Sequence, residues 1–183
     1  PAPPPPSLPT ARGWLAQCRW SASNKGWLLP VDTTHMTAES SQATLIRKLG
    51  HAGLLPFVLL AATVWLVDAD LQPWAAMAMS AYAALIVSYL GGIHWGLAWK
   101  QPDAPAEQQR AHLIWGVAPS LLAWPGVLMP PHAGLVWLAL ALVLCYLVDR
   151  RLYPSAGAGA WLTLRFRLSA VAAVSCFLGA AGA

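Results

Sequence analysis

Long, uninterrupted runs of apolar residues dominate the chain after His51. We interpret these runs as helical spans at about 53–67, 74–99, 111–128, 133–148 and 161–180. A bilayer core takes roughly 17–25 helical residues, so the first and fourth runs are only just long enough to cross it. Strands of a membrane barrel would alternate in polarity at every second residue, and these runs do not alternate. The pattern therefore predicts an all-α polytopic membrane protein, with about five transmembrane helices in an antiparallel bundle.

The first 50 residues have a different pattern, rich in Pro and Ser and opening with Pro1-Ala2-Pro3-Pro4-Pro5-Pro6. Such a run favours an extended polyproline conformation that buries little surface of its own. Basic residues with hardly any acidic ones are also typical of an organellar transit peptide. We expect residues 1–50 to form an extramembrane arm and residues 51–183 to form the five-span membrane domain.

Composition narrows the class of protein further. Apolar residues make up 57% of the chain and charged residues 10%, whereas soluble domains usually carry about 25% charged residues. This excludes an ordinary soluble enzyme and a disordered chain, and the three cysteines have no spacing typical of a metal site or disulfide framework. No nucleophile–base pair, carboxylate pair or phosphate-binding loop is visible. We therefore expect no catalytic residues, no metal, no cofactor and no enzymatic activity of the chain itself, although it would be free to belong to an enzymatic complex.

The placement of the basic residues orients the spans. With five spans, one side of the membrane receives the arm and the segments 100–110 and 149–160, and all 11 Lys and Arg residues lie on that side or at its helix entrances. The opposite side receives Asp68, Asp70 and the turn at 130–132. Basic residues stay on the side from which insertion occurs. We expect the N-terminus on the matrix or stroma side of an organellar inner membrane, with the C-terminus opposite, and no nucleic-acid partner.

Small residues recur at every fourth position along the second predicted span. They are Ala76, Ser80, Ala84, Ser88, Gly92 and Gly96. Small side chains let helices approach closely, which in lipid favours packing. We expect this span to be the central packing helix of the bundle.

Two histidines are the candidate cofactor ligands. His94 lies about 7–8 Å inside the membrane from Trp99, and His112 opens the next span from the same side, so the two rings are expected to approach each other. An ionisable side chain at that depth suggests haem ligation, a metal site, a proton relay or a quinone contact. The alternative is a structural histidine bonded to a neighbouring Ser, Tyr or carbonyl group, and the sequence leaves both open.

Four arginines at span ends are candidate ligands for lipid headgroups. Arg150 and Arg151 close the fourth span, next to Asp149, which we expect to be their partner. Arg165 and Arg167 enter the fifth span, where they either extend to the interface or bind anionic phosphate. Apart from a bound phospholipid or cardiolipin, we expect no ligand at these sites.

Three sequence blocks resemble a known family. They are Leu49-Gly50-His51-Ala52-Gly53-Leu54-Leu55-Pro56-Phe57, Ser88-Tyr89-Leu90-Gly91-Gly92-Ile93-His94-Trp95-Gly96 and Val117-Ala118-Pro119-Ser120. The blocks are similar to those of the multi-pass family of unknown function that includes animal transmembrane protein 69. The resemblance covers about residues 49–180 and omits the arm. It implies a small helical inner-membrane protein associated with mitochondria in eukaryotes, and it implies no catalytic residues.

The sequence leaves three functions open. The first is an accessory subunit of a large organellar inner-membrane complex, with the mitochondrial respiratory chain favoured, that packs through its spans while its arm lies on partner subunits. The second is a haem-, metal- or quinone-binding membrane protein that depends on His94. The third is a small transporter or assembly factor, although transporters often show internal repeats and charged midplane residues that this chain lacks.

Overall fold

A computed structural model describes residues 33–183, with side chains from residue 41 onward. Residues 1–32 of the arm that we expect over residues 1–50 lie outside the described residues. The described elements are α2 (Thr33–Ala52), α3 (Leu55–Leu66), α4 (Gln72–Lys100), α5 (Ala106–Leu128), α6 (Pro131–Leu152), the 3-10 turn η1 (Gly159–Trp161) and α7 (Leu162–Gly182). Residues Thr44–Ala183 form one compact unit.

The five-span helical prediction is confirmed. Five helical segments are long and apolar enough to cross a membrane: Ser41–Leu66, Gln72–Lys100, Ala106–Leu128, Pro131–Leu152 and Gly159–Gly182. Each agrees closely with a predicted span except the first, which begins well before residue 53. The chain is an integral membrane protein.

The helix preceding the first predicted span was not expected, because residues 33–50 were assigned to an extended arm. The helix is possible because no proline falls between Pro30 and Pro56. Pro56 has no N–H group, and its ring conflicts with the carbonyl of the residue four positions earlier, Ala52. The break between α2 and α3 falls at that point, so one candidate span is built from two helices.

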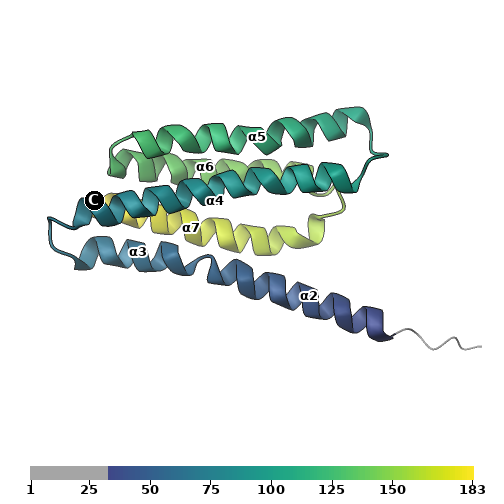
Figure 1. Cartoon of the computed structure of the whole chain (residues 1–183), viewed down its shortest axis with the longest axis horizontal. Helices are drawn as coiled ribbons and strands as arrows, with labels where there is room; N and C mark the ends of the chain where they lie inside the picture. Colours follow the sequence, from purple (N-terminus) through teal and green to yellow (C-terminus); the bar gives the residue numbers. More distant parts are fainter. Residues whose placement is uncertain (1–32) are drawn as a thin grey trace, which may run out of the picture. The chain divides into compact units, whose positions relative to one another are not determined.

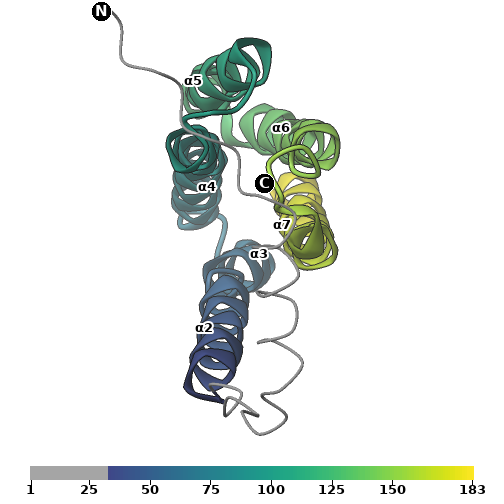
Figure 2. The ribbon, with the colours of Figure 1, turned by 90° about the vertical axis from the view of Figure 1, so that its right-hand side faces the viewer.

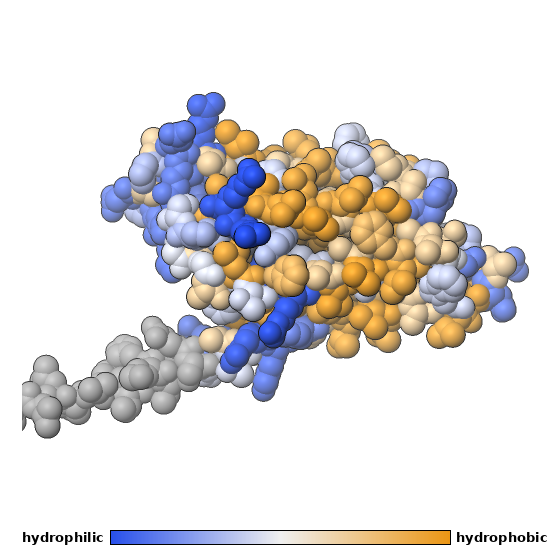
Figure 3. Space-filling view, turned by 180° about the vertical axis from the view of Figure 1, so that it is seen from behind, coloured by the Kyte–Doolittle hydropathy of each residue, from blue (hydrophilic) through white to orange (hydrophobic). Residues whose placement is uncertain are grey.

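The bundle is organised around α4, which packs against α3, α5, α6 and α7 (Figures 1 and 2). Its buried face meets large apolar side chains of the neighbouring helices, and Met79, Val87, Leu135 and Leu138 have no accessible surface. The outer surface is also apolar, and every span carries exposed Leu side chains. Figure 3 shows apolar side chains gathered on one face of the bundle. An apolar outer surface around a packed apolar core is what a bilayer requires.

The stripe of small residues on α4 is only partly a packing face. Its first members, Ala76, Ser80 and Ala84, are buried, whereas Gly92 and Gly96 are exposed, and a Cβ atom added at either would meet no described atom within 4 Å. The physical reason is the helical period: with 3.6 residues per turn, a step of four residues advances about 40° around the axis. Over five steps the stripe therefore drifts by about 200°. Its two ends face opposite sides of α4, which corrects the expectation of one continuous packing face.

The close approach of α4 and α5 occurs instead at Gly91. A Cβ atom at this position would overlap the carbonyl oxygen of Gly116 on α5 and lie 3.3 Å from the Cδ of Pro119. A Cβ atom at Gly116 would likewise overlap the indole ring of Trp95. The nitrogen of that indole donates to the carbonyl of Leu113 at 3.2 Å. The two backbones therefore meet through glycine, as in other tightly packed membrane helices.

Of the Lys and Arg residues whose side chains are described, all but Arg47 and Lys48, which lie in α2 within the first candidate span, gather at one end of the bundle. Lys100 ends α4, Arg110 lies in the first turns of α5, Arg150 and Arg151 end α6, and Arg165 and Arg167 begin α7, which all belong to the same end in Figure 1. Asp68 and Asp70 lie in the turn between α3 and α4 at the other end. This asymmetry agrees with the charge pattern from which the orientation was predicted.

Candidate functional site

Four ionisable side chains from four helices meet inside the bundle. They are His94 of α4, His112 of α5, Asp149 of α6 and Arg165 of α7, with exposed fractions of 0%, 2%, 1% and 8%. Ionisable groups inside a membrane domain are costly, and those that persist face the bundle interior and pair with one another. We refer to these four residues as the polar network.

The network is a continuous chain of short contacts. Arg165 Nε donates to Asp149 Oδ2 at 2.7 Å, and Asp149 Oδ1 lies 2.8 Å from His94 Nε2. His94 Nδ1 in turn lies 2.9 Å from His112 Nδ1. Arg165 also donates from Nη1 to the hydroxyl of Ser169 at 3.1 Å. The carboxylate of Asp149 is therefore held between a guanidinium and an imidazole.

Helical spacing brings the two charged members inside. Asp149 continues the buried seam of α6, whose members are spaced by three and four residues: Leu135, Leu138, Leu142, Cys145 and Asp149. Arg165 begins the matching seam of α7: Arg165, Ser169, Ala172, Cys176 and Gly179. Spacing of this kind keeps side chains on one face of a helix. Both charged residues therefore point inward because they lie in register with apolar neighbours.

The contacts determine the position of one hydrogen, on His94 Nε2, and allow two positions for the hydrogen between the two Nδ1 atoms. Arg165 is always charged, and the carboxylate that pairs with it only accepts hydrogen bonds. His94 must therefore carry a hydrogen on Nε2 to donate to Asp149. If His94 is neutral, its Nδ1 accepts from the Nδ1–H of His112; if His94 is an imidazolium, its Nδ1 donates to His112. Both protonation states make the same set of bonds.

Two network atoms lack a partner among the described residues. Both His112 Nε2 and Arg165 Nη2 are buried without a hydrogen bond. Buried polar atoms of native proteins nearly always find a partner, so an orphan atom asks for an explanation such as a ligand or a proton-exchange role. Each end of the network is therefore open to a further hydrogen bond.

Tyr153 follows α6 and lies beside the network. Its ring centroid is 5.5 Å from that of His94, and the residue is buried. Burial, followed by the nearby Asp149 carboxylate, raises the pKa of Tyr153 to about 12. The phenol keeps its proton at neutral pH and stays a hydrogen-bond donor.

The structure gives limited support to a metal centre. No group of three or more His, Cys, Asp or Glu side chains in the part of the chain that is described is placed to hold a metal ion. Both ring nitrogens of His94 are already engaged, which leaves His112 Nε2 as the free imidazole nitrogen of the pair. Haem or metal ligation by His94 would require one of its bonds to break.

The histidine pair was anticipated from the sequence, but its charged partners were not. We had expected Asp149 to pair with Arg150 and Arg151. It bonds to His94 and Arg165 instead. Arg165 was placed among the candidate headgroup ligands, yet it is buried and engaged with Asp149. The other three arginines of that set are exposed.

Most of the chain, including the whole polar network, is similar to known proteins. Residues 43–181 match DUF3429, a family described as proteins of unknown function. The chain belongs to the DUF3429 family. Over 111 residues it is 38% identical to transmembrane protein 69 of Xenopus tropicalis, which covers 58% of this chain and 42% of that protein. The chain thus spans less than half the length of this relative, and no solved structure matches it.

All four network residues of this DUF3429 protein lie within the matched region. The match also begins inside α2, before the start of residues 49–180 to which we had assigned the resemblance. The family and the five candidate spans together describe a multi-pass membrane protein of unknown function.

Proposed function

We propose that this protein is a histidine-dependent membrane protein, with no catalytic step of its own, that holds and passes on a proton inside the bilayer. The single observation that carries this proposal is the Nδ1–Nδ1 contact of 2.9 Å between His94 and His112, next to the buried carboxylate of Asp149. A chain of imidazole and carboxylate groups is the usual form of a proton relay in membranes.

The proton path follows from the contacts. A proton that arrives at the free Nε2 of His112 makes that ring doubly protonated. The hydrogen on His112 Nδ1 then moves to His94 Nδ1, which leaves His112 neutral and His94 an imidazolium. The imidazolium keeps its Nε2–H on Asp149, whose negative charge stabilises it. One proton is thereby held on His94, and the reverse steps release it.

The network lies in one half of the membrane. His94 is six residues before the end of α4 at Lys100, which is about 9 Å along the helix. Arg165 is in the first turn of α7, at the same end. The site therefore suits proton exchange with the basic side or with a bound molecule, rather than a path across the whole bilayer. A haem, metal or quinone bound at His112 Nε2 is the alternative use of the same free nitrogen.

The proposal is tested by nitrogen NMR of protein labelled at histidine and reconstituted in bilayers, at pH values from about 5 to 8. We expect His94 and His112 to change protonation together, with a proton shared between their Nδ1 atoms. Replacing His112 by Phe should change the His94 signals. The matched control is His51→Phe, since His51 is exposed and bonds to the carbonyl of Arg47 in its own helix. Two rings that titrate independently, or a His94 spectrum that His112→Phe leaves unaltered, would refute the relay.

A second function, an accessory subunit of an organellar inner-membrane complex, is favoured by the outer face of α4. Gly92 and Gly96 are exposed at the spacing that lets membrane helices approach closely, and no described residue covers them. A cavity of about 410 Å³ between α4 and α5, lined by Ala81, Ser88 and Trp124 among others, continues this face. We propose that a partner helix packs here, with the mitochondrial respiratory chain as the favoured setting and the N-terminal arm lying on partner subunits.

This second proposal predicts the size at which the protein migrates in a native gel. Gently solubilised protein should migrate with a large assembly, whose subunits mass spectrometry would identify. Replacing Gly92 and Gly96 together by Leu should release the protein from that assembly, whereas Ala78→Leu, at another exposed position of α4, should not. Migration of the unmodified protein near its own mass of 19.5 kDa would contradict a subunit role.

A further inference from the structure

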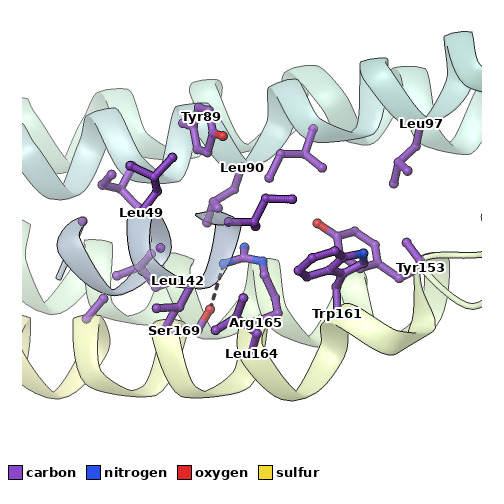
Figure 4. Close-up of a pocket in the computed structure, with 18 of the residues that line it drawn as sticks. Leu49, Tyr89, Leu90, Leu97, Leu142, Tyr153, Trp161, Leu164, Arg165 and Ser169 are labelled. Atoms are coloured by element: carbon purple, nitrogen blue, oxygen red, sulfur yellow. Dashed lines mark hydrogen bonds between the residues drawn. The ribbon is translucent and has the colours of Figure 1, made fainter. Parts of the chain in front are cut away.

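A second cavity lies on the opposite side of α4 from the α5 contact. Its volume is about 720 Å³, within the range of sites that bind small molecules, and α2, α3, α4, α6 and α7 contribute to its walls. Figure 4 shows α4 on one side and α7 on the other, with Leu49 of α2 between them. Leu49 and Tyr89, which both line it, are largely exposed, so the cavity opens toward the lipid-facing surface between them.

The two cationic side chains of the cavity lie at the end near the basic side. Lys100 lies at the end of α4, and Arg165 lies in the first turn of α7. The side chain of Arg165 is nine-tenths buried. Its Nη2 atom makes no hydrogen bond within the described residues, and the nearby phenol of Tyr153, which also lines the cavity, interacts with the same guanidinium. In Figure 4 its guanidinium lies among the cavity side chains, bonded to Ser169. A buried donor without a partner, beside an empty space, indicates that an acceptor belongs there.

Apart from the phenol of Tyr89, the rest of the cavity is apolar, and it is long. Along α4 it extends from Lys100 to Ile86, which is roughly 21 Å of helix. Phe57 of α3 and Ala172 of α7 are also among the lining residues far from the basic end. With increasing depth in the membrane, the cavity wall therefore presents first the ammonium group of Lys100, then the guanidinium donor of Arg165, and then mainly apolar side chains.

Charge selects the kind of headgroup. No Asp or Glu is among the described residues that line the cavity, while Lys100 and Arg165 are both cationic. Asp149 already balances the charge of Arg165, so the unbalanced positive charge at the entrance is that of Lys100. A single negative charge near Lys100 and a neutral acceptor near Arg165 would complement this arrangement.

We infer that this cavity binds one anionic glycerophospholipid, with its phosphate at Lys100, an ester carbonyl accepting from Arg165 Nη2, and an acyl chain along the apolar walls. The order of these groups in a phospholipid matches the order of the side chains with depth. Leu90 and Leu164 line the same cavity and would contact the acyl chain. This inference does not rest on the proton-holding proposal, because it uses neither His94 nor His112.

The test is native mass spectrometry of the full chain, first stripped of lipid in detergent and then titrated with phosphatidylglycerol or phosphatidylcholine. We expect one phosphatidylglycerol to bind with the highest affinity. Removing one cation from a site that binds an anionic lipid near the interface lowers the affinity about fivefold. Lys100→Gln should therefore lower the affinity for phosphatidylglycerol by that factor and leave the affinity for phosphatidylcholine unchanged. The matched control is Arg110→Gln, because Arg110 is an exposed cation at the same end of the bundle, outside the cavity and outside the candidate headgroup ligands.

A second variant tests the cavity itself. Leu97→Trp introduces a bulky side chain into the cavity without touching the polar network, and it should abolish binding of both lipids. Equal losses of affinity for Lys100→Gln and Arg110→Gln would show only a non-specific lipid shell and would overturn the inference. Lipid binding that Leu97→Trp leaves intact would overturn it too, as would a neutral prenyl compound that co-purifies and blocks phosphatidylglycerol.

Discussion

Replacing Asp149 by Leu is expected to lower the free energy of unfolding by about 3–5 kcal/mol, the usual cost of breaking a buried ion pair from one side. The leucine removes the acceptor of both Arg165 Nε and His94 Nε2. The guanidinium cannot release its charge, so it stays inside the bundle without a counterion. The loss therefore comes from the uncompensated Arg165 rather than from any failure of leucine to fill the site.

The matched measurement is a double-mutant cycle with Arg165→Met, in which stability is followed by unfolding in mixed detergent micelles. Because the double variant has no unpaired charge, it should recover most of the stability that either single variant loses. Asp68→Leu is the control, since Asp68 lies exposed in the turn between α3 and α4 and should change stability little. If the Asp149→Leu protein were as stable as the Asp68→Leu protein, the polar network would not contribute to the stability of the fold.

Replacing Gly91 by Ala should destabilise the bundle by about 1–3 kcal/mol, the range found when atoms are forced into a packed core. The added methyl group would overlap the carbonyl oxygen of Gly116, which is backbone and has no rotamer to change. The α4 and α5 helices would have to separate along their closest contact. The same shift would carry His94, three residues further along α4, away from His112 on the facing helix.

Gly92→Ala provides the control at the adjacent position. A Cβ atom there meets nothing within 4 Å, so the substitution should leave the thermal unfolding midpoint unchanged or raise it through the better helix propensity of Ala. Both variants are compared by thermal unfolding in the same detergent. Equal midpoints for the two variants would contradict the close packing at Gly91.

Helical periodicity explains why much of the fold was predictable from the sequence. The spans follow from run length and the bundle from the backbone requirements of lipid, so α4 to α7 end close to their predicted limits. The histidine contact was also within reach, because His94 and His112 enter neighbouring antiparallel spans from the same side. The direction of each side chain around its helix was harder to foresee, and the drifting stripe on α4 is the example.

Asp149 and Arg165 were assigned to the membrane surface because their sequence neighbours are basic residues at span ends. The seam spacing of three and four residues, from Leu135 to Asp149 and from Arg165 to Gly179, was the signal that would have placed them inside. The α2 helix was missed for a different reason: Pro-rich composition before Pro30 was extended to residues that contain no proline.

The order in which the network residues occur along the chain has a consequence for biogenesis. His94, His112 and Asp149 enter the membrane on α4, α5 and α6, whereas Arg165 arrives only with the last helix. Until α7 is synthesised and docks, the carboxylate of Asp149 lacks its guanidinium, and an ionised carboxylate without a counterion is poorly tolerated in hydrocarbon. The three earlier helices therefore need to remain beside the insertion machinery, or to hold Asp149 protonated, until the final span completes the charge balance.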